Sequence, residues 1–127
     1  RDGDRAWLTF TGAPLPGPTK AREELETEVE DADRLLQLLA RLGFEMRFRY
    51  EKYREAFDCG ALVVTIDETP IGTFVELEGE EHDVIETAKR LGRSPADFIL
   101  ASYRELFLTF QAESGSTASH MQFDDLT

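Results

Sequence analysis

One stretch, residues 61–79, constrains the fold of this chain more than any other, because it reads as two β-strands joined by a turn. Residues 61–67, ALVVTID, are apolar and β-branched, as is typical of a well-buried strand. Residues 68–72, ETPIG, have the composition of a turn. In the TFVELEG run that follows, Glu76 and Glu78 share one face, since side chains alternate along a strand. The chain is therefore expected to contain β-structure that carries carboxylates on one face.

Two further strands are expected nearer the start of the chain. AWLTFT, residues 6–11, reads as a plain strand, and RDGDR, residues 1–5, has the composition of a hairpin turn. We expect that the chain begins within this hairpin and that a preceding strand is missing. A second strand is expected over roughly residues 45–57, where Lys52 and Arg54 lie in phase at a period of two.

The segment KAREELETEV, residues 20–29, fits two interpretations after the Pro- and Gly-rich loop at residues 12–18. Its Ala, Glu, Leu and Arg content favours a helix. Read at a period of two, it places Arg22, Glu24 and Glu26 on one face of a strand. It lacks an apolar stripe at helical spacing, so its local sequence leaves both interpretations open.

An amphipathic helix is expected directly after this segment. Its apolar stripe follows helical spacing and consists of leucines alone: Leu35, Leu36, Leu38, Leu39 and Leu42. Asp31 or Asp33 can cap the start of this helix, and Gly43 follows its end. An apolar stripe of this kind normally packs into a core, so we expect these leucines to be buried.

The C-terminal third is expected to be helical. A short apolar stripe lies between residues 84 and 91. Ser94, followed by Pro95, predicts the start of another helix, whose buried face would be formed by Phe98, Ile99, Tyr103, Leu106 and Phe107. The residues beyond this helix are polar and weakly patterned. We therefore expect one domain over residues 1–112 and a polar C-terminal tail over residues 113–127.

The charge balance excludes some classes of partner. The chain has 26 acidic and 14 basic residues and a formal net charge of −12, which argues against binding to a nucleic-acid backbone. A small phosphorylated ligand is compatible, because a local basic cluster can reverse the sign of charge within a pocket. Cys59 is the single cysteine, and the two histidines are isolated, so neither a disulfide nor a zinc site has support. With no apolar run of membrane-spanning length and no signal-peptide pattern, we expect a cytoplasmic protein without a membrane partner.

Alternating charged residues occur on three segments of the chain. Arg22, Glu24 and Glu26 are in phase on the first segment, Lys52 and Arg54 on the second, and Glu76 and Glu78 on the third. The strand that precedes the third segment ends in Asp67. An alternating charged face is most often the solvated face of a sheet. Three such faces of mixed sign in one small chain indicate instead that acids and bases converge. Carboxylates with neighbouring cationic side chains suit Mg²⁺ or Mn²⁺ together with substrate phosphate oxygens, and they do not suit zinc.

The order of LTFTG, KAREELETE, LGF, YEKYRE and VTIDETPIGTFVELEG resembles the CYTH superfamily, also called triphosphate tunnel metalloenzymes, from about Trp7 to Gly79. SYRELF, residues 102–107, is similar to a helix that often follows in bacterial members. The family includes class IV adenylate cyclases, thiamine triphosphatases and bacterial tripolyphosphatases. Its fold is a closed eight-stranded antiparallel barrel with a charged interior. The resemblance implies an α+β protein, in which an antiparallel β-sheet forms part of a CYTH-type barrel and helices pack against it.

The resemblance also implies roles for the charged residues. Asp67, Glu76 and Glu78 match the acids that bind the divalent metal, which would be Mg²⁺ or Mn²⁺. Lys52 and Arg54 match the Lys-x-Arg strand that grips the phosphates of a small triphosphorylated molecule. The resemblance does not identify a catalytic base.

The segment with the ambiguous helix or strand pattern matches a family strand that lines the tunnel. The resemblance therefore favours a strand there, with Arg22 as a further phosphate contact and Glu24 and Glu26 as tunnel-lining residues. Two features depart from the family. Its first Glu-x-Glu-x-Lys strand and a later strand with two arginines would lie before Arg1, and Thr11 stands where the family has a lysine.

The resemblance implies a divalent-metal-dependent hydrolase that acts on a triphosphate such as inorganic tripolyphosphate or thiamine triphosphate. Two alternatives remain open: a non-catalytic phosphate- or polyphosphate-binding module, and adenylate cyclase chemistry on ATP. Because strands of the barrel would be missing, we expect this polypeptide alone to be poorly active, weakly folded or oligomeric. A second copy or a partner segment would then complete the barrel.

Overall fold

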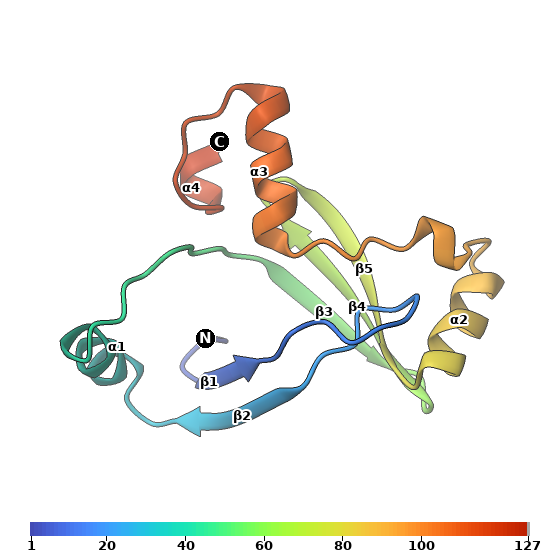
Figure 1. The fold of residues 1–127 in the computed structure, drawn as a ribbon, viewed down its shortest axis with the longest axis horizontal. Helices are drawn as coiled ribbons and strands as arrows, with labels where there is room; N and C mark the ends of the chain where they lie inside the picture. Colours follow the sequence, from blue (N-terminus) through green and yellow to red (C-terminus); the bar gives the residue numbers. More distant parts are fainter. Residues whose placement is uncertain (127) are drawn as a thin grey trace. The chain divides into compact units, whose positions relative to one another are not determined.

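The structure is a computed structural model that describes residues 1–126. It divides into two compact units, Arg1–Arg47 and Phe48–Thr127, and each unit is described by itself (Figure 1). The first unit contains a two-stranded antiparallel sheet, and the second contains a three-stranded antiparallel sheet with helices. The prediction of an α+β fold with antiparallel sheets is confirmed. Neither sheet closes into a barrel within the described residues.

In the first unit, a tight turn leads into the antiparallel pair β1 (Ala6–Thr11) and β2 (Glu24–Val29). The turn predicted for RDGDR is confirmed, because Asp2 and Arg5 exchange backbone hydrogen bonds around Gly3, which has a positive φ of 56°. The strand interpretation of the ambiguous segment is also confirmed over β2. Charged side chains support the pairing, since the guanidinium of Arg5 donates two hydrogen bonds to the Glu28 carboxylate.

Helix α1 (Ala32–Arg41) begins where the sequence predicts, with the Asp31 carboxylate accepting a hydrogen bond from the Arg34 backbone N–H. The expectation that its leucines are buried is wrong for this unit. No residue of α1 is buried, and Leu38 and Leu42 are 56% and 74% exposed. The physical reason is the small size of the first unit, whose only described sheet is a two-stranded ribbon and offers little surface to cover a leucine face.

In the second unit, β3 (Tyr53–Asp58), β4 (Leu62–Thr69) and β5 (Gly72–Gly79) form a meander in the order β3-β4-β5. The two strands and the turn predicted over residues 61–79 are confirmed. The strand predicted from about residue 45 is wrong in its start, because β3 begins at Tyr53. Before it, only Tyr50 makes an isolated bridge, which pairs with Met121. The chain ahead of β3 therefore pairs with the C-terminal segment and not with β4.

Four helical elements follow the sheet: α2 (Glu81–Arg90), the 3₁₀ turn η1 (Pro95–Asp97), α3 (Tyr103–Ser114) and α4 (Phe123–Leu126). The helix predicted from residue 84 corresponds to α2. The single helix predicted from Ser94 is wrong, because that start makes only the one turn of η1. The chain then turns extended at Phe98, with ψ at 132°, and Ser102 begins a separate helix. Ile99 accordingly is 57% exposed, while Phe107 is buried as predicted.

The segment expected to be a polar tail makes ordered contacts in the second unit. Helix α3 extends to Ser114, and Met121 is completely buried. The backbone N–H of Met121 donates to the Arg49 carbonyl at 3.0 Å, and the Glu51 N–H donates to the Met121 carbonyl at 2.9 Å. The C-terminal segment thus lies beside the residues that lead into β3. The last residue of the predicted tail, 127, lies outside the described residues.

None of the helices within residues 1–126 has the length and apolar character needed to cross a membrane.

Candidate functional site

Along β4, the three-stranded sheet buries its polar face, and apolar residues are exposed on the other face of the sheet. Arg54, Asp67 and Phe74 occupy directly opposite positions on β3, β4 and β5, so their side chains share one face. Asp67 on this face has no exposed surface, and Thr65 and Thr69 are also buried. Val75 on the opposite face is 58% exposed. This arrangement inverts the usual pattern of a half-solvated sheet, and it directs attention to the charged face.

The Asp67 carboxylate lies at the centre of a cluster of donors. Lys52 Nζ donates to Oδ2 at 2.8 Å. Arg54 donates from Nε to Oδ1 at 2.6 Å and from Nη2 to Oδ2 at 2.7 Å, which is the bidentate geometry of a strong arginine–carboxylate pair. The Tyr103 hydroxyl donates to Oδ2 at 2.6 Å. Arg54 Nη2 also donates to Glu76 Oε2 at 2.7 Å, so one guanidinium links two carboxylates.

The contacts within the cluster shift the pKa values of Asp67, Arg54 and Tyr103. Burial alone raises the pKa of Asp67, but the hydrogen bonds from Arg54, Lys52 and Tyr103 outweigh it, so this pKa lies well below its ordinary value. The hydrogen bond to Asp67 raises the pKa of Arg54. Burial, followed by the hydrogen bond to Asp67, raises the pKa of the Tyr103 hydroxyl far above its ordinary value. These shifts favour Asp67 as a carboxylate, Arg54 as a cation and Tyr103 as a neutral phenol.

Aromatic rings of the second unit enclose this cluster on one side. The Lys52 ammonium lies 5.0 Å from the centroid of the Tyr103 ring, in cation–π geometry. The Tyr50 and Phe74 rings lie 5.4 Å and 5.6 Å from the same ring. Tyr103 is the first residue of α3, so a helix outside the sheet contributes directly to the cluster.

The sequence assigned Tyr103 only to the buried face of a helix, and its role in the cluster was missed. One local signal could have pointed to it. Ser102 and Glu105 form a capping box, in which the Ser102 hydroxyl accepts from the Glu105 N–H and the Glu105 carboxylate accepts from the Ser102 N–H. That motif fixes the start of a helix and therefore fixes Tyr103 at its first turn.

Of the predicted site residues, the structure brings Lys52, Arg54, Asp67 and Glu76 together. Glu78 lies two residues beyond Glu76 on the same face of β5, opposite Val63. The prediction that Lys52 lies within a strand is wrong, because β3 begins one residue later, at Tyr53.

The predicted residues Arg22, Glu24 and Glu26 belong to the first unit. Glu24 and Glu26 lie on β2, and the Glu26 carboxylate accepts a hydrogen bond from the Thr9 hydroxyl at 2.6 Å. Arg22 precedes β2, and its Nε is buried without a hydrogen-bond partner among residues 1–126. A buried guanidinium nitrogen of this kind can donate to an anion.

The described residues do not form a metal centre by themselves. Within residues 1–126, no three His, Cys, Asp or Glu side chains gather closely enough to hold a metal ion. Both Asp67 oxygens already accept hydrogen bonds from cationic groups, which leaves little capacity for a metal. Glu76 and Glu78 are two carboxylates, fewer than a site made only of protein ligands needs.

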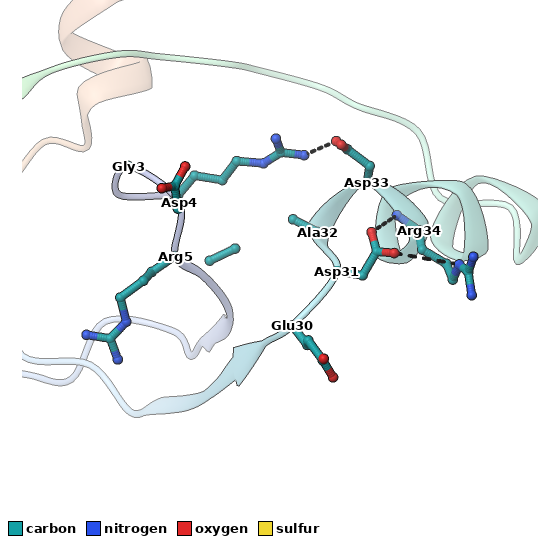
Figure 2. Close-up of a pocket in the computed structure, with 10 residues that line it drawn as sticks. Gly3, Asp4, Arg5, Glu30, Asp31, Ala32, Asp33 and Arg34 are labelled. Carbon is teal, nitrogen blue, oxygen red and sulfur yellow. Dashed lines mark hydrogen bonds and ion pairs between the residues drawn. The ribbon is translucent and has the colours of Figure 1, made fainter.

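An open hollow of about 640 Å³ lies in the first unit, between the turn at Gly3 and the start of α1 (Figure 2). Four of its charged residues form two ion pairs, Arg1 with Asp33 and Arg34 with Asp31, the latter at 3.7 Å between Nε and Oδ2. No predicted site residue lines it. The charged face of the three-stranded sheet is therefore the better candidate for the functional site.

The fold and the site define an α+β protein with a buried cluster of charged residues on an antiparallel sheet. The model of the CYTH domain family matches residues 1–103. The chain belongs to the CYTH domain family.

Relatives agree with this assignment. The protein of Methanocaldococcus jannaschii named "Putative adenylate cyclase MJ0240" is 30% identical over 118 residues, covering 84% of this chain and 67% of the relative. Among solved structures, the PH1819 protein of Pyrococcus horikoshii is 30% identical with a TM-score of 0.66, over 84% of this chain and 66% of that one. The PH1012 protein of the same organism has a TM-score of 0.71 at 23% identity, over 81% and 67%. The chain thus spans about two thirds of the length of these relatives.

Proposed function

We propose that this chain contributes the phosphate-binding site of an enzyme that hydrolyses a triphosphate, with inorganic tripolyphosphate or thiamine triphosphate as the substrate. The observation that carries the proposal is the pair of cations, Lys52 and Arg54, held on the buried polar face of the sheet by Asp67. A phosphate chain is recognised best by such pre-positioned donors, because arginine binds phosphate in bidentate geometry and lysine adds a point charge.

In this proposal, Lys52 and Arg54 donate to the phosphate oxygens of the substrate. The contact of Arg54 with Glu76 is the part-exposed one, so it is the contact that a phosphate oxygen would replace first. The two hydrogen bonds from Arg54 Nε and Nη2 to Asp67 would remain. Stabilising the charge that develops on the leaving phosphate is the contribution these two cations would make to hydrolysis. The residue that activates the attacking water is not identified.

Mg²⁺ or Mn²⁺ enters the proposal as part of the substrate complex. The described residues do not assemble a complete metal centre by themselves. Magnesium commonly keeps one or two protein carboxylates together with substrate phosphates and water. Glu76 and Glu78 are the carboxylates proposed to meet such a complex, and the assignment of Asp67 as a third ligand has less support because its oxygens already accept four hydrogen bonds.

The proposal includes a barrel that this chain forms only in part. In this proposal, Arg22 of the first unit is a further phosphate contact, and Glu24 and Glu26 are tunnel-lining residues. The buried, unpartnered Nε of Arg22 supports this role, because it is a donor that a phosphate oxygen would satisfy. A further segment or a second copy of the chain would supply the remaining strands, and a small triphosphorylated molecule would be the ligand.

Adenylate cyclase chemistry on ATP is the second candidate, and the name of the Methanocaldococcus relative favours it. The two activities differ in the nucleophile, which is water in hydrolysis and the ribose hydroxyl in cyclisation. A non-catalytic phosphate-binding module is the third candidate. The products separate all three, since hydrolysis releases phosphate, cyclisation releases pyrophosphate and a cyclic nucleotide, and a module binds without turnover.

The test measures binding and turnover of tripolyphosphate, thiamine triphosphate and ATP with Mg²⁺, for the unmodified chain and for Arg54→Gln. We expect Arg54→Gln to weaken tripolyphosphate binding by about tenfold or more, the usual scale of a charge-assisted hydrogen bond. Arg104→Gln is the matched control, because Arg104 is an exposed arginine on α3 of the same unit. Equal binding by the unmodified chain and Arg54→Gln would contradict the proposed site.

A further inference from the structure

The role of Tyr103 is not explained by the phosphate contacts proposed above. Tyr103 comes from α3, outside the sheet, yet its side chain makes two separate contacts within the charged cluster. Its hydroxyl donates to Asp67 Oδ2 at 2.6 Å, and its ring lies 5.0 Å from Lys52 Nζ. One residue therefore contacts both the carboxylate and one of the two cations that surround it.

We propose that Tyr103 is a positioning residue that fixes Lys52 for binding the phosphates of a triphosphate, by holding Asp67 with its hydroxyl and Lys52 with its ring. This inference rests on the proposed function. It adds to that function a helical residue that would not itself touch the substrate.

The first argument concerns Lys52, which is otherwise weakly constrained. Lysine has a long flexible side chain, and ordering it costs conformational entropy. Lys52 precedes β3, so no sheet hydrogen bonds hold its backbone in a strand. Its ammonium group is ordered by two contacts, the ion pair with Asp67 and the face of the Tyr103 ring. Arg54 is held in place by its strand, β3, and the Tyr103 ring helps to hold Lys52, which lies outside that strand.

The second argument concerns Asp67, whose Oδ2 atom accepts from Lys52, Arg54 and Tyr103 together. A buried carboxylate needs its acceptor sites filled with good geometry. Tyr103 is the only uncharged donor of the three, so it can stay in place when the cations turn toward a phosphate.

The third argument is that Tyr103 is itself held in place. The Tyr50 ring packs on it at 5.4 Å, and the Phe74 ring meets it edge-on at 5.6 Å. The capping box of Ser102 and Glu105 fixes the first turn of α3, from which Tyr103 projects. A residue that orients others must be rigid, and these contacts provide that rigidity.

The experiment compares Tyr103→Phe and Tyr103→Leu with the unmodified full chain. The phenylalanine variant removes only the hydroxyl, while the leucine variant also removes the ring. Tyr53→Phe is the matched control, since Tyr53 occupies the opposite face of the same sheet and packs on Phe123. Two quantities are measured: the tripolyphosphate affinity by calorimetry, and the NMR shifts of the Lys52 side-chain methylene protons without any ligand.

We expect Tyr103→Phe to weaken tripolyphosphate binding by about three- to tenfold, because one hydrogen bond to a charged group is lost at one remove from the ligand. Its Lys52 protons should keep the upfield shift caused by the ring. Tyr103→Leu should weaken binding further and lose that shift, and Tyr53→Phe should change neither quantity. The Lys52 shift of the unmodified chain tests whether the Tyr103 ring lies over Lys52 in solution. A loss of tripolyphosphate affinity in Tyr103 variants whose urea unfolding is unchanged separates positioning from a folding defect.

Two outcomes would overturn the inference. One is unchanged tripolyphosphate affinity in both Tyr103 variants. The other is a Lys52 shift in Tyr103→Leu equal to that of the unmodified chain, which would show that the ring does not position the ammonium group. Absence of binding by the unmodified chain would instead contradict the proposed function, and the ligand-free Lys52 shift would still decide whether the Tyr103 ring lies over the Lys52 side chain.

Discussion

At the scale of single residues, the side chains with the strongest structural consequences are polar and buried. Asp67 has no exposed surface, yet its carboxylate accepts four hydrogen bonds from three residues. A buried charge is tolerated only when it is paired and hydrogen-bonded, and its partners then depend on it in return. Lys52 and Arg54 would face one another as neighbouring cations without this carboxylate, so Asp67 determines whether the charged face can fold as observed.

The first residue-scale prediction concerns Asp67→Asn. We expect a loss of about 2–3 kcal/mol in the free energy of unfolding at pH 7, below the range for fully buried pairs because Lys52 and Arg54 are partly exposed. The folded pKa of Asp67 is lowered, so its carboxylate stabilises the fold above the unfolded pKa of about 3.9 and loses that contribution as the pH falls below it. Urea denaturation between about pH 3 and about pH 7, from about one unit below the ordinary aspartate pKa to about three units above it, measures both effects.

The difference in stability between the unmodified chain and Asp67→Asn should therefore shrink as the pH falls. A difference that stays constant over this range would show that the charge of Asp67 does not stabilise the fold. Asp58→Asn is a suitable control, because Asp58 lies at the end of β3 on an exposed site and makes only a local contact with the Gly60 N–H.

The second residue-scale prediction compares two buried threonines on the same face of β4. The Thr65 hydroxyl is buried and has no hydrogen-bond partner among residues 1–126. The Thr69 hydroxyl donates to the Gly72 carbonyl at 2.7 Å. We expect Thr65→Val to stabilise the chain by up to about 1 kcal/mol, because an unsatisfied buried hydroxyl is removed at constant shape. Thr69→Val should destabilise it by about 1–3 kcal/mol, since the Gly72 carbonyl loses its donor.

Thermal and urea unfolding of the two variants provide the measurement, and each threonine serves as the control for the other. Equal destabilisation by both substitutions would mean that the Thr65 hydroxyl is satisfied in solution. Thr65 lies directly opposite Glu76, so a hydroxyl that gains a partner there would belong to the proposed ligand site.

At the scale of elements, the sequence predicts strands and helices best where a single period dominates. β4 and β5 follow the predicted pattern, because a β-branched run and a clear alternation flank a turn rich in Gly and Pro. β2 shows the opposite case. Its residues are good helix formers, and the strand forms through pairing with β1 from Ala6 opposite Val29 to Thr11 opposite Glu24. Tertiary pairing overrides local propensity there, so composition alone could not decide it.

The sequence predicts one helix start correctly, at Asp31, whereas the start predicted at Ser94 makes only the one turn of η1. Ser94 and Ser102 both have a residue with a carboxylate three positions later, so both carry the capping pattern. Only Ser102 is followed by enough continuous helix to form α3. The charged cluster could be predicted only in part from the sequence. Alternation along the strands predicts the positions of Arg54, Asp67 and Glu76. The contribution of Tyr103 depends on where α3 packs, which no periodicity reveals.

At the scale of the whole chain, the C-terminal segment joins residues far apart in sequence. The Arg49 backbone N–H donates to His120 Nδ1 at 3.1 Å, and the Glu51 carboxylate accepts from the Phe123 N–H at 3.4 Å. The two contacts join residues that are 71 and 72 positions apart in the sequence, and both involve residues shortly before Lys52. The end of the chain therefore supports the residues that lead into the candidate site, although its sequence is polar and weakly patterned.

Met121 is the buried centre of this segment, so Met121→Ala tests its importance. We expect a loss of about 2–5 kcal/mol in the free energy of unfolding, the usual cost of truncating a buried methionine. All three tyrosines lie in the second unit and the single tryptophan, Trp7, lies in the first, so tyrosine signals report on the unit that contains Met121. Met46→Ala is the control and should change stability by less than about 0.5 kcal/mol, because Met46 is exposed. A tyrosine-detected transition that is equally stable in both variants would show that the C-terminal segment does not hold the second unit together.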